Sequence, residues 1–224
     1  MLKMGRLELK IPASDVNEAR DMGATWDSYN KIWYVPNKIP HERFSKWERL
    51  SKEDTGTLWV LTREYLVAQA YSQCWKCMNT TTVYAIPLIY PNFDLEPAGD
   101  NEDESFEDEC CTISDSGHSF YMCYTKFITE SFARSISEIS NNHYCVDYSK
   151  TSGFSYWMNH CDKCGAKIGD FNLLNDGGAF DVLSEEQARK ILLREVSATY
   201  MEATFDDLSS PILFLGSMPF QPLT

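Results

Sequence analysis

The sequence predicts an α+β protein in which a small βαβα module, residues 1–53, precedes a larger mixed domain, residues 54–224. The first observation is charge: the module carries ten Lys and Arg against eight Asp and Glu, a net of +2, whereas the remainder carries ten against 25, a net of −15. The second is the stretch Ser51–Gly56, whose polar and turn-forming residues place a boundary near residue 54. The third is the apolar pattern, which changes to long β-forming runs from Thr57.

The module begins with a predicted strand and helix. Leu7, Leu9 and Ile11 alternate with polar residues, which is the pattern of a half-buried strand. Asp15 is expected to cap a helix, with Glu18 as its capping-box partner.

The second half of the module predicts a turn, a strand and a last helix. Gly23 is placed to end the first helix in a left-handed conformation. Residues 26–30 suit a turn, Ile32–Val35 a strand that Pro36 stops, and residues 41–50 a short helix.

This module resembles a short uncharacterised bacterial domain whose members read roughly GAxWDxxxKxWY after a strand that ends in VP or IP. The matching residues here are Ile11-Pro12, Gly23-Ala-Thr-Trp-Asp27, Lys31, Trp33, Tyr34 and Pro36. That domain is often attached to conjugation primases and other mobile-element proteins, and it is similar to the HARP domain of annealing helicases. Because a small module needs large aromatic side chains for its core, we expect Trp26 and Trp33 to be core residues rather than platforms for base stacking.

The first half of the larger domain predicts two strands, an insertion and a helix. Residues 58–71 form a long apolar run, and residues 80–90 form a second strand candidate interrupted at Pro87. Residues 93–117 contain ten acidic residues and no basic one, which indicates a solvated acidic insertion. Apolar residues then recur at helical spacing over residues 128–140.

The second half predicts a hairpin, a final helix and a tail. Residues 144–148 and 154–158 suit strands around a turn. Ser184 is expected to cap a final helix with Gln187 as its capping-box partner, and the apolar face of that helix would use Ala188, Ile191, Leu192 and Val196. In the tail, residues 211–216 are apolar enough to dock as an edge strand.

Two Cys-x-x-Cys pairs carry the sharpest chemical signal: Cys74 with Cys77, and Cys161 with Cys164. Zinc prefers four tetrahedral ligands, and such a pair spans one edge of the tetrahedron. We therefore expect one structural Zn²⁺ and a larger domain centred on a zinc ribbon. The pairs stand 83 residues apart, which is far more than a simple ribbon has, so an insertion must separate its halves. Two redox-active pairs are the alternative, but neither pair lies in a thioredoxin-like pattern.

The surroundings of the second pair carry another resemblance. The segment Tyr156-Trp-Met-Asn-His-Cys161 through Gly169-Asp170, together with the earlier Cys74–Cys77 motif, resembles uncharacterised bacterial zinc-ribbon proteins that read about YWxNxCxxCGxxxGD. That resemblance implies one shared site for the two pairs. His160 adjoins Cys161 and is expected to pack or to bond behind the ligands rather than to bind the metal.

The other cysteines leave two alternatives. His118, Cys123, His143 and Cys145 would be needed for a second metal site, but their spacing fits no standard zinc pattern. Buried free thiols are the favoured interpretation for these cysteines and for Cys110 and Cys111.

No assembled catalytic set is visible, so the sequence favours a non-catalytic protein over an enzyme. The charge of −13 disfavours phosphate backbones and favours a basic protein partner, although solubility alone also explains it. The expected function is that of a zinc-stabilised binding protein, immunity- or antitoxin-like, and the alternative is a nucleic-acid accessory protein of mobile elements. The proposed partner-binding residues are Phe93, Asp94, Glu102, Asp103, Glu104, Phe106, Glu107, Asp108 and Glu109.

The compartment is predicted from what the chain lacks. No stretch has the length and apolarity of a membrane span or a signal peptide. Paired Cys-x-x-Cys motifs suit a reducing compartment, so we expect a cytoplasmic protein without membrane contact.

Overall fold

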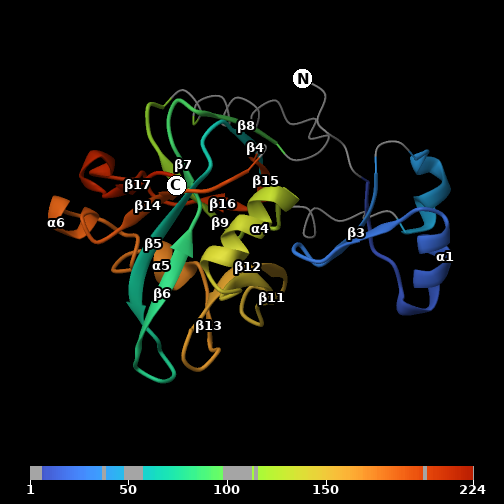
Figure 1. Ribbon diagram of the computed structural model, residues 1–224, viewed down its shortest axis with the longest axis horizontal. Coiled ribbons are helices and arrows are strands. Elements are labelled where there is room, and N and C mark those ends of the chain that lie inside the picture. The colour runs from blue at the N-terminus through green and yellow to red at the C-terminus, as the bar shows by residue number, and fades with distance from the viewer. Residues whose placement is uncertain are drawn as a thin grey trace.

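The computed structural model describes residues 7–36, 39–47, 58–97, 113, 116–198 and 201–223, and it confirms the α+β class (Figure 1). A small N-terminal part, residues 7–47, stands beside a larger part, residues 58–223. The predicted boundary near residue 54 lies outside the described residues. No helix in the described ranges is long and apolar enough to cross a membrane.

The N-terminal module is a three-stranded antiparallel sheet with one α-helix and two 3₁₀ helices. Its elements are β1 Leu7–Leu9, η1 Ala13–Asp15, α1 Val16–Asp21, β2 Thr25–Asp27, β3 Ile32–Val35 and η2 His41–Trp47. The strand order is β1-β3-β2. The expected turn at residues 26–30 therefore begins with a strand that the βαβα prediction lacked, and the last helix is a 3₁₀ helix.

The start of α1 differs from the prediction. Asp15 makes no side-chain capping bond, so the predicted capping box is wrong. Its carboxylate instead accepts a hydrogen bond from Trp47 Nε1 at 2.9 Å, which ties η2 to the start of α1. Gly23 does adopt a positive φ of 107° after α1, and an added Cβ there would collide with the Ile39 side chain.

The core of the module corrects the expectation for one of its two tryptophans. Trp26 is 44% exposed, so it is not a core residue. Trp33 is half-buried and packs against the core. The buried hydrophobic core of the module consists of Leu9, Ala19, Ala24, Val35, Phe44 and Trp47.

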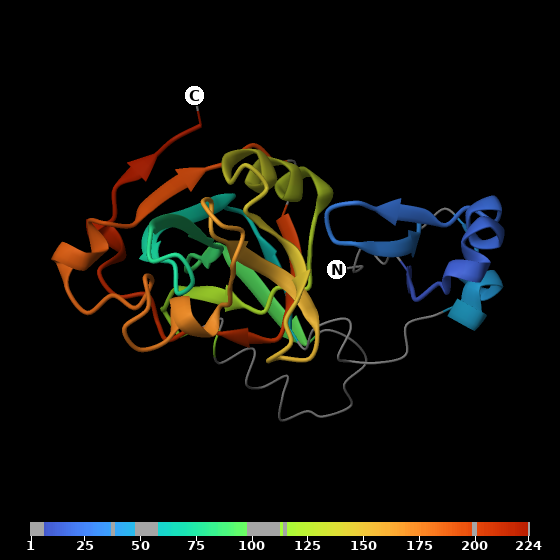
Figure 2. The same cartoon turned by 90° about the horizontal axis from the view of Figure 1, so that it is seen from below.

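Asn30 makes several of the bonds that join the module to the larger part. Asn30 lies at the tip of the β2–β3 hairpin, which points toward the larger part in Figure 2, and it is 2% exposed. Its amide donates to the Ile128 carbonyl at 2.8 Å, and its Oδ1 accepts from Ile128 N at 3.0 Å and from Trp157 Nε1 at 2.9 Å. Asp27 Oδ2 accepts from the same amide at 2.8 Å. The Asn30 side chain thus bonds both the N–H and the C=O of Ile128, as the main chain of a neighbouring strand would.

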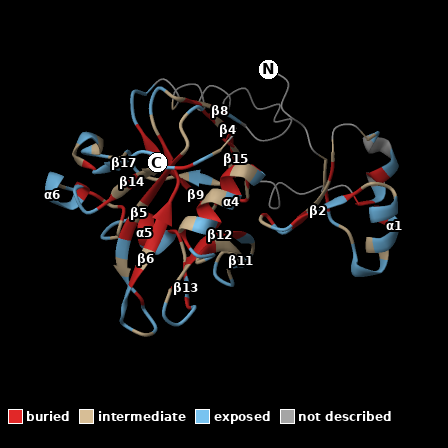
Figure 3. Cartoon of the chain, in the orientation of Figure 1, coloured by how far each residue is buried: buried red, intermediate tan, exposed pale blue. Residues whose placement is uncertain are grey.

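The larger part consists of small sheets packed around two cores. Figure 3 shows in red the buried residues of this larger part. Its elements are β4 Leu58–Thr62, β5 Leu66–Gln73, β6 Thr80–Ala85, β7 Pro87–Leu88, β8 Phe93–Pro97, β9 Phe120–Cys123, β10 Phe127–Ile128, α4 Glu130–Ile139, β11 Tyr144–Tyr148, β12 Ser155–His160, β13 Lys167–Ile168, α5 Phe171–Leu174, α6 Glu185–Ala188, β14 Leu192–Glu195, β15 Met201–Phe205, β16 Asp207–Leu208, η3 Leu215–Ser217 and β17 Phe220–Gln221. The sheets have the orders β10-β15-β4-β8, β17-β14-β5-β6, β11-β12-β13 and β16-β9-β7.

The long strand predicted over residues 58–71 is two strands in different sheets. The chain turns at Arg63–Tyr65, where the Thr62 hydroxyl accepts from Glu64 N at 3.2 Å and Arg63 N donates to the Asn92 carbonyl at 2.8 Å. The second run, residues 80–90, divides into β6 and β7 around Ile86, and β7 begins at Pro87.

The acidic stretch begins as a strand. Residues 93–97 form β8, which pairs antiparallel with β4, and Phe93 is 4% exposed. The sequence has no cation within this stretch, but Arg63, which follows β4, provides one: its Nη2 lies 2.7 Å from Asp94 Oδ2. Residues 98–112 lie outside the described part of the chain.

The hairpin and the amphipathic helix follow the prediction, whereas the final helix does not. Helix α4 buries Phe132, Ala133 and Ile136, and β11 pairs with β12 in antiparallel register. Strand β9 was not predicted.

The final helix, α6, has only four residues. The predicted cap is present, since Ser184 Oγ accepts from Gln187 N at 3.3 Å. The following residues form β14, which pairs with β5, so the predicted helical face is wrong. In the tail, the strand that docks at the edge is β17, parallel to β14, and not residues 211–216.

Candidate metal centre

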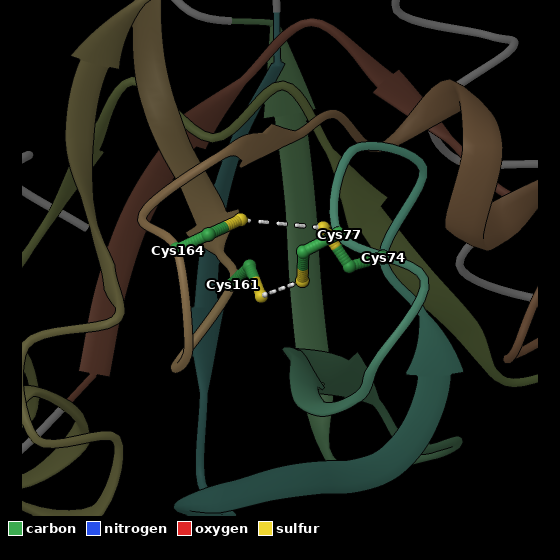
Figure 4. Close-up of side chains that lie close together, drawn as sticks. All are labelled: Cys74, Cys77, Cys161 and Cys164. Carbon is green, nitrogen blue, oxygen red and sulfur yellow. Dashed lines mark hydrogen bonds between the residues drawn. The ribbon is translucent and has the colours of Figure 1, made fainter.

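The structure brings four cysteines together at one end of the larger part. The sulfur atoms of Cys74, Cys77, Cys161 and Cys164 all lie within 4.8 Å of one another (Figure 4). Cys74 Sγ is 3.6 Å from Cys164 Sγ, and Cys77 Sγ is 3.7 Å from Cys161 Sγ. A metal ion with four sulfurs at about 2.3 Å has tetrahedron edges of about 3.8 Å. The four thiols are therefore close enough to hold one metal ion.

The two Cys-x-x-Cys turns have the same backbone geometry. The carbonyl of the first cysteine accepts from the amide four residues later at 2.9 Å, which is Met78 in one turn and Gly165 in the other. Those residues have φ values of 60° and 67°. Glycine adopts this conformation without strain, so Gly165 suits its turn, whereas Met78 adopts it against its side chain's preference. Each turn joins two antiparallel strands, β5 to β6 and β12 to β13.

Two polar side chains fasten one turn to the other, and the sequence analysis did not identify them as functional. Asn159, 1% exposed, accepts from Tyr84 N at 2.7 Å and donates to the Tyr84 carbonyl at 2.9 Å, so it bridges β12 to β6. Thr81 Oγ1 accepts from Asp162 N at 3.0 Å. The sequence feature that could have identified Asn159 is its position, two residues before Cys161 and next to β-forming residues.

The thiols do not titrate independently. Burial opposes ionisation of Cys161, but the amides of Lys163 and Cys164 outweigh it and lower the pKa of that thiol to about 6. A hydrogen bond from the Asn79 amide lowers the pKa of Cys77. The Ala166 amide favours the Cys164 thiolate, yet burial and the three neighbouring thiols raise its pKa to about 12. Four thiolates so close together repel one another, and a cation bound between them would offset that repulsion.

The donor set restricts what the metal can do. Four tetrahedral sulfur donors suit zinc or an iron–sulfur centre, and a metal with four protein ligands keeps no position for water or substrate. Cys74 and Cys161 are fully buried in the core, whereas Cys77 is half-buried and Cys164 is exposed.

His160 lies outside the cluster and belongs to another group. Its Nε2 is 3.2 Å from Asp147 Oδ2, and its Nδ1 is 3.7 Å from Cys145 Sγ. The contact with Cys145 raises the pKa of this imidazole to about 9, against the effect of burial. Catalytic sites in which histidine activates a cysteine nucleophile also place a thiol, an imidazole and a carboxylate in this order. Here, however, the Asp147 carboxylate also pairs with Lys167 Nζ at 3.0 Å.

The alternative second metal set is not assembled. Within the described ranges, the four-cysteine cluster is the one group of three or more His, Cys, Asp or Glu donors close enough for a metal. Cys123 is buried, which raises the pKa of its thiol. Cys145 is half-buried beside His160, and Cys110 and Cys111 lie outside the described residues.

The predicted partner-binding residues divide between core, surface and undescribed chain. Phe93 is a core residue, so in this structure it is not exposed to a partner. Asp94 is on the surface in an ion pair with Arg63. The others lie outside the described part: Glu102, Asp103, Glu104, Phe106, Glu107, Asp108 and Glu109.

The comparisons with known proteins match only the N-terminal module of this chain. Residues 6–49 match the family model described as Domain of unknown function (DUF5710). A stretch of 47 residues, 21% of this chain, is 36% identical to the DNA primase TraC of Escherichia coli, of which it covers 4%. No solved structure matches the chain. The N-terminal module thus matches a domain of unknown function, and a stretch of similar length in this chain is similar to part of a DNA primase.

Proposed function

We propose that this protein is a non-catalytic binding protein, immunity- or antitoxin-like, whose larger part is held together by one structural zinc ion. The closed set of four thiols at Cys74, Cys77, Cys161 and Cys164 is the observation that carries the structural part of this proposal. Zinc fits because it takes four thiolates tetrahedrally and is not redox-active. A reducing cytoplasm would keep these thiols available for it.

The proposed partner is a basic protein. Residues 54–224 carry a net charge of −15, and several of the ten cations in this stretch are engaged by its own carboxylates. Such pairs include Arg134 with Glu130, Arg189 with Glu185 and the buried Lys126 with Asp206. The unpaired excess is negative and concentrated by sequence in residues 93–117. Long-range attraction to a basic surface would accelerate encounter, and the effect would weaken as salt screens it.

A charge-neutralisation experiment tests the partner. The variant converts the acidic residues from Glu102 to Glu109 to Gln or Asn, and its control converts as many exposed carboxylates elsewhere, for example at Glu138, Glu185 and Glu186. We expect a salt-sensitive complex with a basic protein in a pull-down from the native host, lost in the first variant and retained in the control. Equal binding by both variants contradicts the proposal.

A second candidate is a nucleic-acid accessory function of mobile elements. The match to part of a DNA primase favours it, as does the net charge of +2 on residues 1–53. The charge of the whole chain opposes it. A gel shift on the full chain, with Arg20→Gln and Lys31→Gln as variants and Lys190→Gln as the control, separates the two candidates. Tight DNA binding that the first two variants weaken would put this candidate first.

A further inference from the structure

A cavity of about 710 Å³ lies beside the first cysteine turn and has no role in the proposed function. Its walls come from that turn, from the loop after β9, from the β11–β12 hairpin and from the start of α5. The volume is within the range of small-molecule sites. Five aromatic side chains line it: Trp75, Tyr124, Tyr148, Tyr156 and Phe171.

The aromatic residues at the rim are left in water. Trp75 and Phe171 are each 67% exposed, and Tyr148 is 49% exposed. Three large exposed rings around one cavity are more than scattered surface residues would provide, and such clusters mark interaction sites. These three rings are therefore accessible to a ligand and do not pack in the core.

The structure holds these rings in place before any ligand arrives. Trp75 Nε1 donates to the Lys167 carbonyl at 2.8 Å, so the indole is fixed by a strand 92 residues away. On the floor, Tyr124 meets Tyr156 edge-on with ring centroids 5.2 Å apart. Gly169 makes room for this floor, because a Cβ there would lie 2.8 Å from the Tyr156 hydroxyl. A preorganised aromatic site loses little entropy on binding.

The charge of the cavity is opposite to that of the protein. Of its thirteen lining residues, all in the described part of the chain, two are lysines and none is acidic. Lys150 is exposed, and it has no ion-pair partner in the described ranges. Lys167 is partly neutralised by Asp147, 3.0 Å away. Asp170 lies behind the wall, 5% exposed, with its carboxylate accepting from Tyr124 N at 2.7 Å.

We propose that this cavity binds a planar heteroaromatic ring that carries a phosphate, that is, a nucleotide unit, either free or within a single strand. The ring would stack on Trp75 and Phe171, and the phosphate would lie at Lys150. Stacking on aromatic side chains strengthens binding about 5-fold or more per base, and an exposed lysine adds a salt-dependent attraction to phosphate. The Ser149–Ser152 turn beside that lysine also lines the cavity, and a bond of 3.3 Å between the Ser149 and Ser152 hydroxyls holds it in shape.

Calorimetric titration of the metal-loaded full chain tests this site with three probes: adenosine 5′-monophosphate, adenosine, and a single-stranded oligodeoxyadenylate of about ten nucleotides. We expect the monophosphate to bind, and adenosine to bind several-fold more weakly. A much tighter oligonucleotide identifies a strand as the source of the ligand, and equal affinity identifies a free nucleotide. Absence of binding by the monophosphate and the oligonucleotide overturns the proposal, and equal binding of adenosine overturns its phosphate part.

Variants assign the binding to this cavity. Phe171→Ala and Trp75→Ala should each weaken binding about 5-fold or more, and Lys150→Gln about 3- to 10-fold with a shallower salt dependence. Metal content is measured for each variant; Phe171 lies outside the cysteine turns, so its variant remains informative if Trp75→Ala loses metal. The matched controls, Phe220→Ala and Lys190→Gln, remove an exposed ring and an exposed cation elsewhere and should bind as the wild type does. Unchanged affinity in both aromatic variants contradicts the site.

Discussion

The two parts of this molecule close their cores in different ways. The module packs Leu9, Val35, Phe44 and Trp47 from one continuous stretch of chain, so its contacts are local. The larger part pairs β4 with β15 and joins cysteine turns whose sulfurs are 84 and 90 residues apart in sequence. Closing such long loops has an entropic cost that local contacts do not have. A metal site and buried amide bridges are suited to offset that cost.

The largest expected effect is loss of the metal. Cys161→Ser should release the ion and destabilise the larger part by about 4 kcal/mol or more, because binding free energy at such a site is folding free energy. The control, Cys123→Ala, removes a buried thiol outside the cluster and should cost about 1–2 kcal/mol with metal retained. Elemental analysis and chemical denaturation measure both. If the Cys161→Ser protein is as stable as the control, the larger part does not depend on a metal site in the way that distinguishes it from the module.

The next effect concerns the junction of the two parts. Asn30→Ala should lower the free energy of unfolding by about 2–4 kcal/mol, because Trp157 Nε1 and both Ile128 main-chain groups lose a buried partner. Asn172→Ala, at an exposed asparagine, is the control and should change stability by less than about 0.5 kcal/mol. Hydrogen exchange at Ile128 gives an independent measurement. Unchanged exchange there would mean that the module docks by other contacts.

A smaller effect depends on pH. Burial raises the pKa of the Asp170 carboxyl from 3.8 to about 7, although the Tyr124 amide acts in the opposite direction. The folded protein therefore keeps this proton to a higher pH than the unfolded chain does, so the stability from this group falls as pH rises from about 4 to about 7. Asp170→Asn should have no such loss.

The free energy of unfolding of Asp170→Asn, relative to that of the wild type, should rise by about 1–3 kcal/mol as the pH increases from 5 to 8. Urea denaturation at both pH values measures this difference. The amide oxygen of the variant can still accept from Tyr124 N. Asp176→Asn, at an exposed carboxylate, should stay within about 0.5 kcal/mol of the wild type at both pH values. A gain that is equal at pH 5 and pH 8 would exclude titration of Asp170 as the cause.

The smallest effect is at the strand that begins the acidic stretch. Arg63 and Asp94 form an exposed pair with 60% and 47% of their side chains accessible. Arg63→Ala should cost less than about 1 kcal/mol, and 0.5 M salt should remove most of the difference. A larger loss in thermal denaturation would show that β8 depends on this pair for its place beside β4.

The sequence alone determined those features whose physical cause is local. The four cysteines were found from their spacing, because a metal needs two thiolates at one edge of its tetrahedron. Helix α4 and the β11–β12 hairpin follow from apolar periodicity and a turn, and the left-handed end of α1 follows from the position of Gly23.

Tertiary structure decided what depends on distant partners. Residues 192–195 have an apolar pattern that suits a helix, but the edge of β5 makes them a strand. Trp26 is exposed because β2 lies at the edge of its sheet. The roles of Asn30 and Asn159 depend on main-chain groups 98 and 75 residues away, and the aromatic cavity exists only where four separate segments meet. Local patterns carry no information about which distant amide a side chain will satisfy, so these features appear only in the folded chain.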